Sequence, residues 1–143
     1  MLVNGNWTLC DDGFVRPLIK ASIMALDATW SPTEFLVDTG ADRTVFCGTT
    51  LKKLALAHRP APHQLGGVGG SSATVVVSTQ IRLTLADANV LTLEGVFAAF
   101  IDETAVDMNL LGRDILDLFA VIVDKPDNAV KLIAKPHRYI VSI

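Results

Sequence analysis

The feature that most constrains the fold of this chain is a period of two in its apolar residues from Val75 to Leu85. Apolar side chains occupy positions 75, 77, 81, 83 and 85, and polar residues occupy most positions between them. Because successive side chains of a β-strand point to opposite faces, this alternation predicts a half-buried strand. A second run, Val90 to Ile101, follows the turn-forming residues 87–89, so the two runs together predict a hairpin.

Other segments extend the β pattern. Arg16 to Met24 is rich in strand-forming residues and leads into a turn-like stretch, 27–32, before an apolar run that ends at Val37. Near the C-terminus, Phe119 to Val123 and Val130 to Ala134 are separated by turn-forming residues and predict another hairpin. Many short strands of this kind are typical of a barrel or a sandwich.

One segment has helical spacing. After Gly112, the apolar residues Ile115, Leu116 and Phe119 recur as on one side of a short helix. The chain has 143 residues, half of them apolar, and contains no internal repeat or linker. We therefore expect a single, mainly β domain over residues 1–143, with one short helix near its end.

Charge and hydropathy narrow the range of partners. The net charge is −3 and no basic stripe is present, which argues against nucleic acid. No uncharged apolar run approaches the roughly 20 residues needed to span a bilayer. Met1 to Asp12 lacks the basic start and the apolar stretch of a signal peptide. We therefore expect a soluble, cytoplasmic protein that binds neither nucleic acid nor membrane.

The cysteines and histidines indicate no metal or redox site. Cys10 and Cys47 show neither metal-ligand spacing nor a C-x-x-C pair, so reduced thiols are the favoured interpretation and one disulfide is the alternative. His58, His63 and His137 stand among prolines and basic residues and are interpreted as surface loop residues. We expect neither a metal nor a cofactor.

The most unusual setting belongs to Asp38. It follows the apolar run 35–37 and precedes Thr39 and Gly40. One interpretation is a strand that ends in an ordinary turn, since Asp and Gly are common turn residues. The other is a functional carboxylate where a buried strand opens into a tight loop. Gly40 would then allow a close approach of backbone, and Thr39 would offer a hydroxyl for a hydrogen bond across an interface.

The segment 35–46, which contains Asp38-Thr39-Gly40-Ala41-Asp42, resembles the active-site loop of retropepsins, the retroviral aspartic peptidases and their single-domain cellular relatives. Leu65-Gly66-Gly67-Val68-Gly69-Gly70 resembles the glycine-rich flap tip of that family. Asn109-Leu110-Leu111-Gly112-Arg113-Asp114 resembles the segment before its short helix, and Arg16-Pro17-Leu18-Ile19 is similar to its first long strand. The resemblance covers about residues 16–119 in the family's order, and it implies a closed β-barrel with a flap hairpin.

The resemblance implies an aspartic endopeptidase. Aspartic peptidases are the standard example of two carboxyls that share one proton and titrate together. One carboxylate takes a proton from a bound water, and the other donates to the carbonyl oxygen of the peptide bond. This chain holds one such motif, so we expect Asp38 of two copies to meet across a twofold axis. The implied partners are a second copy of the chain and a peptide or protein substrate.

The resemblance also implies roles for neighbouring residues. Thr39 would hydrogen-bond to the partner's loop, and the carbonyl of Gly40 would contact the substrate backbone. Residues implied in substrate binding, in largely apolar pockets, are Ala41, Asp42, Gly66, Gly67, Val68, Gly69, Met108, Asn109 and Leu110. The glycines would let a flap open and close. A phosphate-binding loop is the alternative for this segment, but it lacks Gly-Lys-Ser/Thr and no helical pattern follows. A plain flexible hairpin is the other alternative.

Gly112 and Arg113 are implied as support for the active-site loop. Arg113 would pair with Asp42 in a partly buried, bidentate ion pair, and loss of one partner would cost about 3–5 kcal/mol. Arg16 would reach Asp42 of the other subunit. For Arg43 two interpretations stay open: it favours acidic substrate side chains, or it simply faces solvent.

Two further points bear on function. The hairpin of residues 119–134 is expected to replace the interleaved chain ends that build the interface in viral members, as in single-domain cellular relatives.

A catalytically silent, dimeric peptide-binding module with the same fold is the competing function. A third possible function is a structural interaction domain without a groove, but it would require the three motifs to coincide by chance. The intact Asp38, Thr39 and Gly40 favour an active enzyme.

Overall fold

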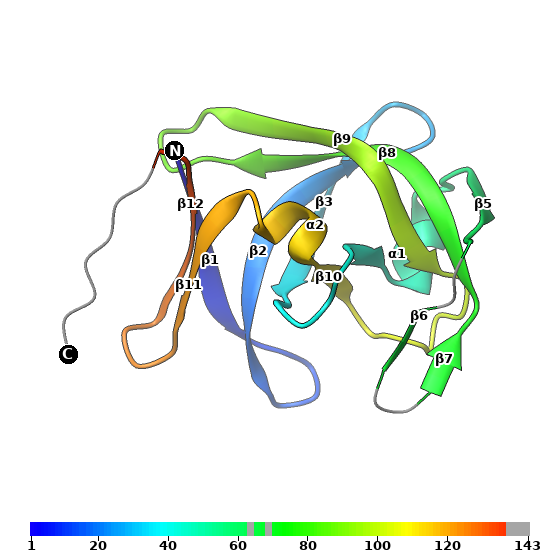
Figure 1. Ribbon diagram of the computed structural model, residues 1–143, viewed down its shortest axis with the longest axis horizontal. Coiled ribbons are helices and arrows are strands. Elements are labelled where there is room, and N and C mark those ends of the chain that lie inside the picture. Colours follow the sequence, from blue (N-terminus) through cyan, green and yellow to red (C-terminus); the bar gives the residue numbers. More distant parts are fainter. Residues whose placement is uncertain (63–64, 68–69, 137–143) are drawn as a thin grey trace.

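The computed structural model describes residues 1–62, 65–67 and 70–136, and strands dominate it (Figure 1). The strands are β1 (Leu2–Leu9), β2 (Val15–Met24), β3 (Trp30–Val37), β4 (Val45–Phe46), β5 (His58–Pro60), β6 (Leu65–Gly67), β7 (Gly70–Ser72), β8 (Thr74–Thr84), β9 (Val90–Phe100), β10 (Asn109–Leu111), β11 (Phe119–Asp124) and β12 (Ala129–Ala134). Two short helices, α1 (Gly48–Lys53) and α2 (Arg113–Leu116), join them in the described part.

One large sheet carries most of the strands. Its order is β11-β12-β1-β2-β3-β10-β4-β9-β8-β5, and β6 and β7 form a separate hairpin. An additional pairing of β2 with β8 closes the six strands β2-β3-β10-β4-β9-β8 into a barrel. The mainly β fold, the closed barrel and the short helix after Gly112 are thus confirmed.

The barrel is filled by the apolar residues that the alternating pattern predicted to point inward. On β8, Val77, Ile81 and Leu83 are fully buried. The rings of Phe35, Phe46 and Phe97 form a second part of the core, with centroids 6.1 Å apart for Phe35 and Phe46 and 5.6 Å apart for Phe46 and Phe97. Such tilted aromatic contacts add to the stabilisation that comes from burial. Because Phe35 and Phe46 lie on β3 and β4, the core fixes both ends of the loop that contains Asp38.

The predicted hairpins are both present. Strands β8 and β9 pair from Thr84 and Val90 at the turn to Thr74 and Phe100 at the far end. Strands β11 and β12 form the C-terminal hairpin, and β12 continues the sheet by pairing with β1. This leaves β11 as the last strand on its side of the described sheet.

Several elements differ from the sequence-based expectations. Strands β1, β4, β5 and β10 and helix α1 were not predicted, and His58, expected in a loop, lies in β5. Helix α1 spans only six residues, and too few apolar positions show its period. The turn-like stretch 27–32 is partly strand, since β3 begins at Trp30. Pro32 is tolerated there because β10, the neighbour on its other side, pairs with β3 only from Phe35 to Val37.

Two remaining expectations concern the cysteines and the membrane. Cys10 and Cys47 are both free thiols, Cys47 buried and Cys10 half-buried. Among the described residues, no helix has the length and apolar character needed to cross a membrane.

Candidate active site

Asp38 follows the last residue of β3 and begins a tight loop. Its backbone N–H donates to the carbonyl of Leu111 at 3.1 Å, and its own carbonyl accepts from the N–H of Ala41 at 3.2 Å. Its carboxylate Oδ1 accepts from the N–H of Gly40 at 3.0 Å. The Asp38 side chain is half-buried, and Thr39 and Gly40 are exposed. A Cβ on Gly40 would lie 3.3 Å from Asp38 Oδ1, so a larger residue would press on the carboxylate.

The short strand β10 ties the two ends of this loop together. It runs parallel to β3, with Leu110 opposite Leu36, and antiparallel to β4, with Leu110 opposite Val45. The strands that enter and leave the loop are therefore held by a segment about 70 residues further along the chain. This arrangement positions Asp38 at the end of a strand inside the sheet, not on a free hairpin.

Thr44 is the centre of a hydrogen-bond network behind the loop. Its side chain is fully buried, at 0% exposure. Its hydroxyl donates to Asp114 Oδ1 at 2.7 Å and accepts from the N–H of Gly112 at 3.1 Å. The same Asp114 oxygen accepts from the N–H of Thr44 at 2.8 Å. These bonds join the loop to the start of α2.

Gly112 must be glycine at this junction. A Cβ there would lie 2.2 Å from the carbonyl carbon of Arg43 and 2.7 Å from the nitrogen of Thr44. Both neighbours are backbone atoms and cannot turn aside. Sequence reasoning gave Gly112 a supporting role but missed Thr44 and Asp114, because a single Thr and a single Asp 70 positions apart carry no local signal.

Arg113 pairs with Asp42, as the resemblance implied, but the pair differs in character from the expectation. One contact is formed, between the guanidinium Nη2 of Arg113 and Oδ1 of Asp42, and the side chains are 52% and 79% exposed in the single chain. The expected partly buried, bidentate pair is therefore wrong for the single chain, since both groups stand at the surface. An exposed pair of this kind contributes about 0–1 kcal/mol, not the 3–5 kcal/mol expected from sequence.

Asn109 does not line a pocket, contrary to the sequence-based expectation. Its side chain is 3% exposed. Its Oδ1 accepts from the N–H of Cys47 at 2.9 Å, and its Nδ2 donates to the hydroxyl of Thr33 at 2.9 Å. An amide on the inward side of β10 is satisfied by these bonds and stabilises the sheet. Its neighbours Met108 and Leu110 are half-exposed.

The flap segment forms the expected hairpin in its described part. Strands β6 and β7 pair antiparallel, with Leu65 opposite Ser72 and Gly67 opposite Gly70. This hairpin makes no pairing with the large sheet in the described residues, and in Figure 1 it extends below the barrel. Val68 and Gly69, predicted at its tip, lie outside the described residues.

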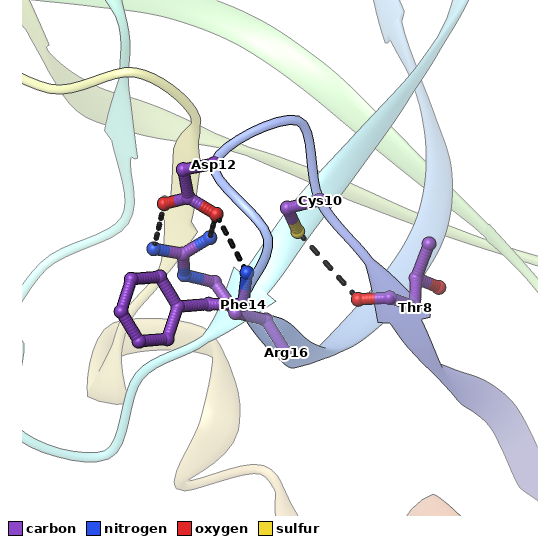
Figure 2. A network of polar contacts seen from close by, with 5 residues as sticks. All are labelled: Thr8, Cys10, Asp12, Phe14 and Arg16. Atoms are coloured by element: carbon purple, nitrogen blue, oxygen red, sulfur yellow. Dashed lines mark hydrogen bonds and ion pairs between the residues drawn. The ribbon is translucent and has the colours of Figure 1, made fainter.

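Arg16 lies at the start of β2 and is engaged within its own chain (Figure 2). Its guanidinium donates to both carboxylate oxygens of Asp12, at 2.8 and 2.5 Å, and lies 5.5 Å from the centroid of the Phe14 ring. The hydrogen bonds from Arg16 lower the pKa of Asp12 from 3.8 to about 2, and a bond from the N–H of Phe14 adds to the effect. The predicted contact of Arg16 with Asp42 of a second subunit stays a prediction.

The described cavities of the single chain lie away from this loop. One of about 450 Å³ is lined by residues of β8 and β9 and by the turn after β2, and one of about 630 Å³ lies between α1 and residues 101–104. Neither includes a residue of the Asp38 loop.

Comparison with known proteins identifies the class. The aspartyl protease family model matches residues 26–115, well over half of the chain. The chain belongs to the aspartyl protease family, and its fold is retropepsin-like. A search among curated proteins found no match.

Two solved structures show the similarity of fold. The EIAV protease, solved in complex with the inhibitor HBY-793, is 25% identical, with a TM-score of 0.53 over 71% of this chain and 86% of that chain. A retropepsin-like aspartic protease from Rickettsia conorii is 16% identical, with a TM-score of 0.58 over 92% of this chain and 97% of that chain. The second similarity extends to the C-terminal hairpin, because it covers nearly the whole length of both chains.

Proposed function

We propose that this protein is an aspartic endopeptidase that acts as a homodimer, with one Asp38 carboxylate from each copy. The observation that carries the proposal is the setting of Asp38, at the end of a barrel strand in a loop braced from behind by β10 and α2. The family assignment supports the chemistry. A single chain supplies one such carboxylate, and the reaction needs two.

The chemistry follows from the pairing of the two carboxylates. Brought close together, they cannot both be ionised, so the pair holds one shared proton. The ionised group removes a proton from a water as its oxygen attacks the peptide carbonyl carbon, and the protonated group donates to the carbonyl oxygen. The proton taken from the water then passes to the leaving nitrogen. As the C–N bond breaks and the carbonyl re-forms, the other carboxylate recovers a proton from a hydroxyl of the tetrahedral intermediate, so the pair again holds one shared proton. Thr39 and Gly40 are proposed as an inter-subunit contact and a substrate contact.

The substrate groove is proposed to lie between this loop and the flap. Its walls on the loop side would be Ala41, Asp42, Met108 and Leu110, and Gly66 and Gly67 would approach from the flap. Leu110 already packs beside Val45 and Phe100, so its exposed part would offer an apolar surface. Such a groove favours substrates with apolar side chains next to the cleaved bond.

The test is cleavage of a peptide library at several pH values by the wild-type protein and by Asp38→Asn. We expect the substitution to abolish cleavage, because an amide cannot take a proton from water. Asp107→Asn, which removes an exposed aspartate outside the motif, is the matched control and should cleave as the wild type does. Equal cleavage by Asp38→Asn and the wild type would contradict the mechanism.

The competing function is a dimeric module that binds peptides without cleaving them. It predicts that the wild-type protein captures peptides from the library and returns them intact at every pH. Mass spectrometry of the recovered peptides distinguishes the two functions, since only the endopeptidase produces new chain ends. The carboxylate of Asp38, which a silent module would not need, favours the enzyme.

A further inference from the structure

Arg43 stands apart from the other arginines in the described part of the chain. Its side chain is exposed and makes no hydrogen bond, ion pair or ring contact with the described residues. The other four described arginines are engaged: Arg16 with Asp12, Arg59 with Ser78, Arg82 with the ring of Trp30, and Arg113 with Asp42. Among the described arginines, Arg43 is therefore the one whose side chain makes none of these contacts, and it lies five residues after Asp38 in the same loop.

The backbone of Arg43 is nevertheless fixed. Its carbonyl group packs directly against Gly112, where even a Cβ would clash. On one side, the carbonyl of Asp42 accepts from the N–H of Asp114 at 3.2 Å, and on the other, Thr44 is clamped by the Asp114 carboxylate. The fixed backbone limits the guanidinium of Arg43 to the region that its side chain can reach from this point.

The neighbouring acids do not neutralise Arg43. Asp42 forms its ion pair with Arg113, and Asp114 accepts hydrogen bonds from Thr44. A guanidinium without a carboxylate partner is a ready binding site for one, since its planar N–H groups match the two oxygens of a carboxylate.

We propose that Arg43 is a specificity-determining residue that selects substrates with acidic side chains on both sides of the cleaved bond. This proposal rests on the proposed function and names its substrate class. In a twofold dimer, Arg43 and its mate stand at equal distances from the paired Asp38 residues, one toward each end of the groove. The preferred sequence therefore has an apolar centre with an acidic residue at matched positions before and after it.

The expected size of the preference follows from the exposure of the ion pairs. One exposed pair favours binding by about two- to fivefold, so two pairs give a preference on the order of tenfold. Because solvent-exposed charges are screened by salt, the preference should fall markedly between about 0.05 and 0.5 M salt.

The experiment compares kcat/KM for three matched peptides that share one apolar centre. The first carries Glu on both sides, the second carries Gln at the same positions, and the third carries Lys. For the wild-type protein we expect the order Glu, Gln, Lys. For Arg43→Gln the Glu-to-Gln ratio should fall to about one, for Arg43→Glu the order should reverse, and Arg43→Lys should keep part of the preference. Lys20→Gln, which removes one exposed positive charge from β2, is the control and should keep the wild-type ratio.

Failure of this proposal can be told from failure of the proposed function. If the wild type cleaves the Gln peptide and Arg43→Gln leaves the Glu-to-Gln ratio unchanged, Arg43 does not set specificity although the enzyme is active. If no peptide is cleaved, fluorescence anisotropy of the labelled peptides with Asp38→Asn and with Asp38→Asn/Arg43→Gln still measures selection. Tighter binding of the Glu peptide that depends on Arg43 supports the proposal, and equal binding of all three peptides overturns it.

Discussion

The hydroxyl of Thr44 occupies a position where both its donor and its acceptor capacity are used. It donates to the carboxylate of Asp114 and accepts from the backbone of Gly112, in a place that water does not reach. A valine has nearly the same shape but can make neither bond. Replacing Thr44 by valine therefore removes the hydrogen bonds of this side chain and keeps its packing.

We expect Thr44→Val to lower the free energy of unfolding by about 1–3 kcal/mol, because the buried N–H of Gly112 loses its partner. Thr92→Val, on the exposed side of β9, is the matched control and should change it little. Urea unfolding, monitored by circular dichroism, measures the free energy of unfolding of both variants. A Thr44 variant as stable as the control would show that the network contributes nothing net.

A second residue-scale prediction concerns pH. The pKa of Asp12 is lowered from 3.8 to about 2, chiefly by the hydrogen bonds from Arg16. Because the folded-state pKa lies below the ordinary value, the stabilisation is fully present above pH 3.8 and is lost as the pH falls toward about 2. NMR titration of the Asp12 carboxyl should show this low pKa, and Arg16→Gln should raise it, whereas Arg59→Gln should not. An Asp12 pKa that is the same in Arg16→Gln and in the wild type would contradict the described ion pair.

Among the elements, β10 best illustrates what sequence patterns can and cannot predict. Three residues are too few to show a period of two, and the parallel pairing of β10 with β3 joins segments far apart in the chain. Long strands such as β8 and β9 were predictable because each spans eleven residues. Apolar residues recur with a period of two along much of β8, and β9 is a mainly apolar run that follows a turn. The site combines both kinds of element, so its motifs were visible in sequence and its bracing was not.

Strand β11 is the element on which we expect the second copy to dock. Its sequence FAVIVD carries no charge before Asp124, and Ile122 and Val123 are 37% and 43% exposed on the last strand of the described sheet. An uncharged apolar edge strand is a template for pairing with another strand, and two identical edges can pair antiparallel about a twofold axis. The expected role of the C-terminal hairpin in the interface stays a prediction that this edge supports.

Ile122→Lys tests that role. Two lysines brought together across the axis repel, so we expect the dissociation constant of the dimer to rise by about tenfold or more. Val90→Lys, at the exposed start of β9, adds the same charge elsewhere and should leave it unchanged. Sedimentation velocity at several concentrations measures both variants, and circular dichroism checks that each is folded. Equal dissociation constants would place the interface on another surface.

For the whole molecule, the proposed shared site makes a quantitative prediction about mixtures. If subunits exchange freely and both carboxylates are needed, an equal mixture of wild type and Asp38→Asn forms wild-type pairs in about one quarter of the dimers. Peptide cleavage should therefore fall to about a quarter of that of wild type at the same total concentration. A fall to one half would mean that each copy works alone.

How well a feature could be predicted depended on how far apart in the chain its interacting residues lie. Local patterns predicted both hairpins and left a barrel or a sandwich open. The resemblance to the family implied the closed barrel and the support of the Asp38 loop by Gly112 and Arg113. The burial of Asn109, the surface exposure of the Asp42–Arg113 pair and the role of Thr44 depend on contacts between distant segments. For these residues the sequence gives the type of side chain but not whether the fold covers it.

The bonds between Thr44, Gly112 and Asp114 also have a kinetic meaning. They close a loop of about 70 residues, and contacts of such long range form late because the chain must first give up much of its freedom. A chain that is still being synthesised, or is only partly folded, therefore contains Asp38 before β10 and α2 support its loop. Under the proposed function, cleavage would have to wait until long-range folding and then association are complete, and this delay would protect the protein from copies of itself during its own synthesis.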